Sequence, residues 1–474
     1  MRKFLLRSLL VLAVLAVLAA IGGIALLIER NSAKTAWERY AAAAKARGVK
    51  LSLKDEMLQP SIPDAENFAA VPIFDNLFKP GVSGTAVKLF DLPRSWKPGD
   101  TIPTDLDAWR AYFVQENVLA ADAPEASPAA ILRALDEKFG ADWQQLSEAA
   151  TRSRSRFPVN WSNGYYEPLP HITALTSAAN ICGLRADAHI AQGDGPAAHD
   201  DLHLHLRLRW ALEQEPVLIS WIVSNSILSI AIERIRRGLA AHVWDDSTLV
   251  LIDGDLARIK PLSGYRLATE SERAWLNDFH ASAQASDRES LKAVITAMTG
   301  GSGSSFLPVS LPKSWLYRNQ IRSNEYVDEV LKAIDVAAER YVPTSPRSSA
   351  SSPKPGRLER INYALFYAMM PAYPYFEKDA LYTHTRVQCA RTAVALERWR
   401  LAQGAYPESL AALVPGLLPA VPHDVMDGQP LRYRRTEEGG YLLYSIGIDA
   451  KDDGGIGTKP RRSDKDAPDW VWQP

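Results

Sequence analysis

The sequence predicts a mainly α-helical protein with three parts: an N-terminal transmembrane helix, a large α-helical body, and a small C-terminal α+β domain with a three-stranded antiparallel sheet. Three observations support this fold class. A long uncharged apolar run follows the first few residues, apolar side chains recur at helical spacing through most of the chain, and short strand-like segments separated by glycine turns come last. At 474 residues, the chain also exceeds the size at which one hydrophobic core keeps growing.

The N-terminus has the pattern of an uncleaved membrane anchor. Arg2, Lys3 and Arg7 precede an uncharged run from Ser8 to Ile28, which is long enough to cross about 30 Å of hydrocarbon at about 1.5 Å per residue. A cleavable signal peptide has a shorter apolar region, of about 7 to 15 residues. Basic residues before a span keep the N-terminus in the cytoplasm. Residues 1–29 are therefore interpreted as the leader and anchor of a single-pass inner-membrane protein whose bulk is periplasmic.

The charge balance argues against a nucleic-acid partner. Lys and Arg number 54 and Asp and Glu 55, which leaves a net charge of -1, and no basic stripe runs along any segment. The apolar content of 47% supports sizeable hydrophobic cores.

Residues 30–342 are predicted to form the helical body. An alanine-rich helix follows the anchor and ends at Gly48, since glycine adopts the left-handed backbone that closes helices. Prolines at 60, 63, 72 and 80 exclude a long helix in the next segment, which is predicted to be an ordered strap packed on the body. From about Thr104 to Arg340 the chain is predicted to be mostly helical.

Within the body, ICGLRADAHIAQGDGPAAHDDL places a glycine turn, Gly193 to Gly195, between two helical stretches. It resembles one helix-turn-helix unit of a tetratricopeptide array, although no repeat follows at the period of about 34 residues that defines such arrays. The next residues, Leu202 to Trp210, alternate apolar and polar, which by period alone is typical of a strand. As a helix they would place leucines on two opposite sides, which suits a helix between two neighbours, and we predict the helix.

The same segment invites a metal hypothesis. HDDLHLHLRLRW sets His199 and His203 four residues apart on one helix face, with Asp200 nearby, and this spacing suits zinc. Arg207 lies one helical turn after His203 on the same face, and Arg209 lies one turn after His205. A fixed positive charge thus follows both histidines. Metal binding is therefore the less favoured interpretation here.

The two cysteines, Cys182 and Cys389, both lie among apolar residues at helical spacing. Two interpretations stay open: two small buried hydrophobic residues, or one long-range disulfide.

Two segments interrupt the helical pattern. Residues 299–315 are rich in glycine and serine and then proline-bounded, and residues 343–356 are poor in apolar side chains throughout. Both are predicted to be loops, and the second a linker between the body and a C-terminal domain at 357–474.

Short catalytic motifs give no support for an enzyme. The sequence has no HExxH, no G-x-S-x-G, no GxxxxGK[ST] and no GxGxxG after a strand. This absence does not exclude catalysis, so the question of enzymatic activity stays open.

The C-terminal region has a different pattern. A helix from about Asp379 to Gln403 ends at Gly404, and AYPESLAALVPG predicts a short helix. QPLRYRR and GYLLYSIG predict two strands joined by the turn EEGG, and DWVW predicts a third strand.

Three motifs in this region, ALERWRLAQGAYPESLAALVP, DGQPLRYRR and YSIGIDAKDDGG, occur in the order found in one known family. Over about residues 380–472 the chain resembles the globular domain of the major pseudopilin of type II secretion systems. Two features depart from that family: Val425 replaces a usual proline, and the loop after the second strand is lengthened by a basic insertion. The anchor also lies far upstream and has no pseudopilin processing site, so the chain is not expected to assemble as a pilus subunit.

The resemblance implies a calcium site in the loop after the second strand. Asp449 and Asp469 match the family's motif, and Asp452 and Asp453 are additional expected ligands. The chemistry agrees, because calcium takes six to eight oxygen ligands and a glycine-containing loop curls easily around it.

Together these features predict a membrane-anchored bacterial envelope protein. The expected role is non-catalytic, structural or adaptor-like, with a protein partner in the envelope. The alternative is a periplasmic enzyme of the hydrolase type whose site lies in a cleft of the helical body.

Overall fold

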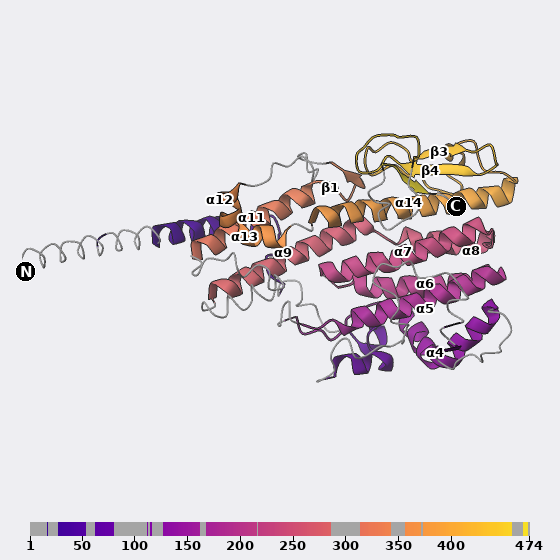
Figure 1. Cartoon of the computed structure of the whole chain (residues 1–474), viewed down its shortest axis with the longest axis horizontal. Coiled ribbons are helices and arrows are strands. Elements are labelled where there is room, and N and C mark those ends of the chain that lie inside the picture. The colour runs from indigo at the N-terminus through magenta and orange to yellow at the C-terminus, as the bar shows by residue number, and fades with distance from the viewer. Residues whose placement is uncertain are drawn as a thin grey trace, which may run out of the picture. The chain divides into compact units, whose positions relative to one another are not determined.

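The computed structural model describes residues 17, 27–53, 62–79, 111, 114–115, 127–161, 167–215, 217–285, 313–342, 356–370, 373–456 and 468–472. Within them the protein is mainly helical, with a three-stranded antiparallel sheet near the C-terminus (Figure 1). The chain forms two compact units. The first comprises Met1–Leu58, Thr269–Lys332 and Thr344–Pro374, and the second Gln59–Ala268, Ala333–Pro343 and Tyr375–Pro474.

Most of the described residues of the second unit are helical. The helices are α4 (Pro128–Ala150), α5 (Pro170–Gln192), α6 (Gly195–Glu213), α7 (Leu218–Ala240), α8 (Asp246–Ala257), the start of α9 (Pro261–Ala285) and nearly all of α14 (Tyr373–Gln403).

The predicted helix-turn-helix around Gly193 is confirmed as α5 and α6. Gly193 closes α5 with φ 75°, in the left-handed region. Asp194 then caps α6 by accepting the N–H of Ala197. The two helices can therefore fold back on each other within a tight turn.

The prediction of a helix over 202–210 is also confirmed, and its leucines do face two sides. Leu204 and Leu208 belong to one hydrophobic core, with α4 and α5. Leu202 belongs to a second core, with α7 and α8. The alternation that resembles a strand thus results from a helix buried between two apolar layers.

Residues 62–79 form the predicted strap. It contains the short 3-10 helices η1 (Asp64–Glu66) and η2 (Pro72–Phe78), and Phe68 and Phe74 are buried against Phe157. Arg152 fastens it, since Nη1 donates to three backbone carbonyls of the strap at 2.8 to 3.0 Å.

The C-terminal sheet has the predicted order and pairing. It contains β3 (Arg432–Arg435), β4 (Tyr441–Ser445) and β5 (Trp470–Trp472), all antiparallel, with β4 in the centre. The sheet follows η5 (Leu410–Leu413) and the long helix α14 (Tyr373–Gln403), which begins before the predicted start at Asp379. Leu443 and Trp472 of the sheet share one hydrophobic core with α14, α7 and α8.

The first unit contains α11 (Lys313–Lys332), α12 (Arg357–Asn362), α13 (Ala364–Met369) and most of α9. Residues 27–46 are helical and Gly48 has φ 78°, as predicted for the end of that helix. Part of the contact between α9 and α11 is polar: Asn277, Asn324 and Gln320 are buried and hydrogen bonded to one another. The remaining strands, β1 (Ile334–Asp335) and β2 (Arg340–Tyr341), pair in the second unit.

Several predictions fall largely outside the described residues. These are the anchor up to residue 26 apart from Val17, the loop from 299 to 312, and the linker from 343 to 355. The end of the predicted loop, 313–315, is helical and begins α11, so that part of the prediction is wrong. Each compact unit draws on chain from both sides of the linker, and the predicted domain bounds stay a prediction.

Among the described residues, α7 is the one helix long and apolar enough to cross a membrane. It has the features of a core helix, because 61% of its apolar window is buried within the protein. Arg234 of α7 also forms a buried ion pair with Asp187 of α5 at 2.9 Å. Cys182 and Cys389 are both free and buried, in agreement with the first of their two interpretations.

Candidate metal sites

The loop that follows β4 is tied to β5 by Asp469, one of the predicted ligands. Asp469 immediately precedes β5 and is fully buried. Its Oδ2 accepts the N–H of Gly455 at 2.8 Å, and its Oδ1 lies 3.5 Å from the N–H of Asp453. Burial raises the pKa of this carboxyl, and the nearby acids Asp452 and Asp453 add to the rise.

Asp452 shapes the same loop. Its Oδ1 accepts hydrogen bonds from the Tyr444 hydroxyl and the Gly454 N–H, both at 3.0 Å, and these bonds lower the pKa of its carboxyl. Gly454 and Gly455 have φ of 77° and 80°, a region that L side chains rarely adopt. At Gly455 an added Cβ would lie 2.6 Å from the Leu442 side chain, so the glycine pair is required by the turn.

The structure brings the carboxylates of two of the four predicted acids, Asp452 and Asp469, to the backbone of residues 453–455, and a third acid, Asp453, belongs to that turn. Asp449 is exposed at the start of the loop, where its carboxylate accepts the Lys451 N–H at 3.2 Å and closes a local turn. A cation also lies close to these acids, since Arg432 Nε is 3.6 Å from Asp452 Oδ2.

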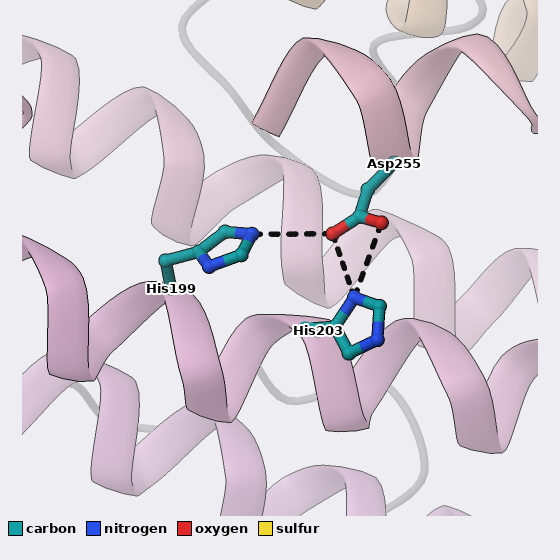
Figure 2. Close-up of side chains that lie close together, drawn as sticks. All are labelled: His199, His203 and Asp255. Atoms are coloured by element: carbon teal, nitrogen blue, oxygen red, sulfur yellow. Dashed lines mark hydrogen bonds and ion pairs between the residues drawn. The ribbon is translucent and has the colours of Figure 1, made fainter. Parts of the chain in front are cut away.

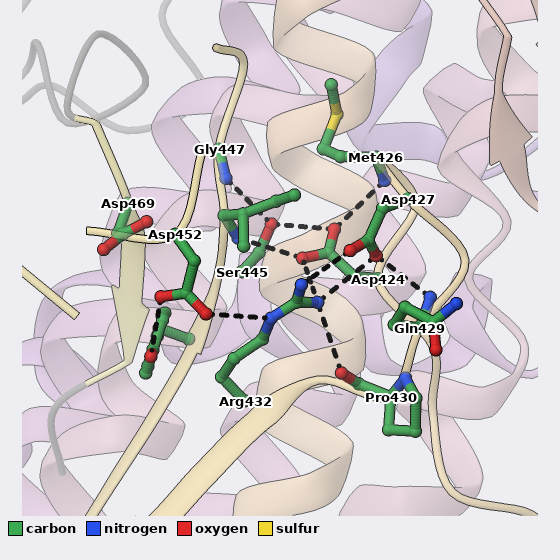
Figure 3. A network of polar contacts seen from close by, with 12 residues as sticks. Asp424, Met426, Asp427, Gln429, Pro430, Arg432, Ser445, Gly447, Asp452 and Asp469 are labelled. Atoms are coloured by element: carbon green, nitrogen blue, oxygen red, sulfur yellow. Dashed lines mark hydrogen bonds and ion pairs between the residues drawn. The ribbon is translucent and has the colours of Figure 1, made fainter. Parts of the chain in front are cut away.

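A second acidic group, missed by the sequence analysis, lies beside this loop (Figure 3). Asp424 is fully buried. Its Oδ1 accepts from Ser445 Oγ at 2.9 Å and from the Met426 N–H at 3.0 Å, and its Oδ2 accepts from the Ile446 N–H at 2.9 Å. One carboxylate therefore fixes the end of β4 to the turn before β3.

Arg432 of β3 links Asp424 to the calcium-loop candidate (Figure 3). Its Nη2 donates to Asp427 Oδ2 at 2.6 Å and its Nη1 lies 3.5 Å from Asp424 Oδ2. This pairing lowers the pKa of the Asp427 carboxyl. The signal in the sequence is HDVMDG, two aspartates three residues apart in a turn that leads into a strand bearing an arginine.

The histidine pair of α6 meets an acid that the sequence analysis did not include, Asp255 of α8 (Figure 2). His199 Nε2 lies 3.2 Å from Asp255 Oδ2, and His203 Nδ1 lies 3.1 and 2.9 Å from its two oxygens. One donor atom from each of the three residues lies within 4.8 Å of the other two. Asp200, the acid considered in the sequence, is exposed, with Oδ1 3.9 Å from His199 Nδ1.

The arginines that argued against a metal are engaged by other groups. Arg207 Nε donates to the Ala150 carbonyl at 2.8 Å, and its guanidinium lies 3.9 Å from the centre of the Trp210 ring. Arg209 forms a two-bond ion pair with Glu213 at 2.8 and 2.9 Å.

Comparisons with known proteins add no assignment. No family model matches the chain, and no curated protein and no solved structure matches it.

Proposed function

We propose that this chain is a single-pass inner-membrane protein of the bacterial envelope, with its bulk in the periplasm. Its C-terminal region is a pseudopilin-like module that binds calcium. Its role is non-catalytic, structural or adaptor-like: it holds a protein partner at the membrane. The uncharged run from Ser8 to Ile28 behind three basic residues supports the anchor.

The observation that carries this proposal is the position of Asp469. A buried carboxylate directly before β5 accepts N–H groups from the loop that follows β4, and so joins the acidic first part of a long connection to its end. Two further acids, Asp452 and Asp453, lie in the same turn; burial raises the pKa of the Asp469 carboxyl, and their negative charges raise it further. A divalent cation among these carboxylates would offset that repulsion.

The donor set fits a hard cation. Calcium takes oxygen ligands at about 2.3 to 2.6 Å from carboxylates and backbone carbonyls, in loops that glycine allows to curl. Asp449, Asp452, Asp453 and Asp469 would supply the carboxylates. The bound ion would hold the loop after β4 on β5, and so present one rigid surface of the module to a partner.

The adaptor role is tested by purification of the full-length chain from solubilised membranes, in calcium or in a chelator. We expect a partner at a fixed ratio to the wild-type chain in calcium, and its loss in the variant Asp449→Ala. The matched control is Asp427→Asn, which removes an acid outside the loop and should keep the partner. The absence of any fixed-ratio partner would contradict the adaptor role.

The anchor has a separate test. Membranes washed at high pH should retain the full-length chain, because an apolar span resists extraction while surface-bound proteins are released. A soluble mature protein that begins between residues 21 and 29 would contradict the anchor and indicate a cleaved signal peptide.

A further inference from the structure

The triad of His199, His203 and Asp255 has the spacing of a metal centre. Two ligand atoms about 2.0 to 2.2 Å from one zinc ion, at a tetrahedral angle, lie about 3.4 Å apart. The distances from Asp255 Oδ2 to His199 Nε2 and His203 Nδ1 are 3.2 and 2.9 Å. The ligand atoms of His199 and His203 lie within 4.8 Å of each other. Side-chain rotations would therefore place all three groups around one ion.

The backbone holds this convergence in place. His199 and His203 are one turn apart on α6, so both side chains project from the same face. Asp255 projects toward them from α8, which packs on α6 through a shared hydrophobic core that includes Leu202, Leu249 and Leu256. Three ligands from two packed helices form a site without rearrangement of any loop.

The location of Asp255 gives a second, independent indication. It lies in the last turn of α8, where the carbonyl ends of the helix disfavour a negative charge and favour a cation. Its side chain is only 12% exposed. Among the described residues, two arginines act on this carboxylate: Arg258, which is exposed and lies 3.8 Å away, and Arg207 of α6, which interacts with it electrostatically while its Nε is bonded to the Ala150 carbonyl. Positive charge from across the helix interface favours an acid so placed, and the two histidines are the groups in direct contact with it.

We infer that His199, His203 and Asp255 form a binding site for a divalent transition-metal ion, best suited to zinc. Two imidazole nitrogens and one carboxylate oxygen favour zinc, copper or nickel over calcium and magnesium, which prefer oxygen ligands alone. Three protein ligands also leave one tetrahedral position for water. The site is independent of the calcium loop, because it lies on other elements and uses other chemistry.

Access from solvent is consistent with this site. The His203 side chain is 43% exposed and gives an ion a route from solvent, whereas His199 is nearly buried and holds the inner side. When Nε2 of His199 binds the metal, its Nδ1 carries the proton; the exposed Asp200 Oδ1 lies 3.9 Å from Nδ1, beyond hydrogen-bond distance.

The test uses the untagged full-length chain in detergent, stripped of metal and kept in excess calcium to occupy oxygen-only sites. Titration with Co²⁺ should give the visible absorption of a tetrahedral complex that saturates at one ion per chain, and Zn²⁺ should displace it. His203→Gln and Asp255→Asn should each weaken binding at least about 100-fold, since even outer-shell changes cost about 10- to 100-fold.

The control variant is His242→Asn. His242 also pairs with a carboxylate, Glu397 at 2.8 Å, but among the described residues the other groups on that carboxylate are Arg400 and the Tyr406 hydroxyl, so no second imidazole is present; the variant should keep full affinity. Thermal unfolding in chelator checks that each variant still unfolds cooperatively; His203→Gln should melt somewhat below the wild type, because it removes one partner of the Asp255 carboxylate. Wild-type chain without saturable Co²⁺ binding, or His203→Gln and Asp255→Asn variants that bind Co²⁺ as tightly as the wild type, would overturn the inference.

Discussion

Replacement of Asp424 by alanine should loosen the C-terminal sheet far more than replacement of its neighbour Asp427. Asp424 accepts hydrogen bonds from the Met426 N–H, the Ser445 hydroxyl and the Ile446 N–H, and all three donors belong to buried residues. Without the carboxylate these donors lose their partner in a place that water reaches poorly. A buried unsatisfied donor costs about 1 to 3 kcal/mol.

The three lost hydrogen bonds share one carboxylate, so their free-energy costs are not additive. We therefore expect a total of about 3 to 5 kcal/mol, the range for breaking a buried charged group away from its partners. Asp427 offers the matched comparison, because it pairs with the same Arg432 but its side chain is 27% exposed. Asp427→Asn should cost about 0 to 1 kcal/mol, as exposed ion pairs do.

Hydrogen exchange of the full-length chain, read by mass spectrometry, separates these outcomes. The peptides over 441–456 and 468–472 should lose protection in Asp424→Ala and keep it in Asp427→Asn, since protection reports local opening free energy. Equal loss in the two variants, or unchanged protection of Ile446 in Asp424→Ala, would refute the reasoning.

Three further predictions follow from other parts of the chain. Burial lowers the pKa of His205 to about 4; the unfolded chain binds more protons between about pH 6.5 and 4, so the fold loses stability through this histidine as the pH falls through that window. Between pH 7 and 5, chemical unfolding of His205→Gln should show a loss about 2 kcal/mol smaller than that of the wild type, which shares with the variant the losses at His280 and His384, whose pKa values are also lowered by burial; identical pH dependence of the two chains would contradict this. Arg152→Ala should release the strap at 62–79, with a cost of about 1.5 to 3 kcal/mol and faster exchange confined there; an unchanged exchange rate argues against the fastening role. Light proteolysis should cut within 343–356 and leave fragments that elute together, because the sheet shares a core with α7 and α8; resistance of this segment would count against the linker.

Much of the second unit could be predicted, because its turns depend on interactions between residues that are close in sequence. The turn at Gly193 and the hairpin before Tyr441 depend on residues adjacent in sequence, and glycine supplies the backbone each requires. The burial of the strap could also be predicted, since prolines exclude a helix and Phe68 and Phe74 need an apolar surface.

The polar sites were harder to predict, because packing of distant elements creates them. Asp255 meets His203 only because α8 packs on α6, and Asp424 meets Ile446 only because the turn before β3 folds against the end of β4. No spacing in the sequence encodes either distance. The arginine at 207 was misleading for the same reason: it is one turn from His203, yet its guanidinium bonds to carbonyls at the end of α4.

The calcium loop is tested most directly by the unfolding of the full-length chain with calcium and with a chelator. A site that binds at about 10 μM should be stabilised by roughly 2.7 kcal/mol in about 1 mM calcium, as mass action requires at about 100 times the dissociation constant. Asp449→Ala is the sharpest variant, because Asp449 is exposed and closes only a local turn, and Asp427→Asn is its control. The account predicts that calcium raises the unfolding temperature and slows exchange over 447–456 and 468–472 in the wild type and Asp427→Asn, but not in Asp449→Ala. Superimposable unfolding and exchange of the wild-type chain in calcium and in chelator would contradict it and leave the loop as an acidic turn.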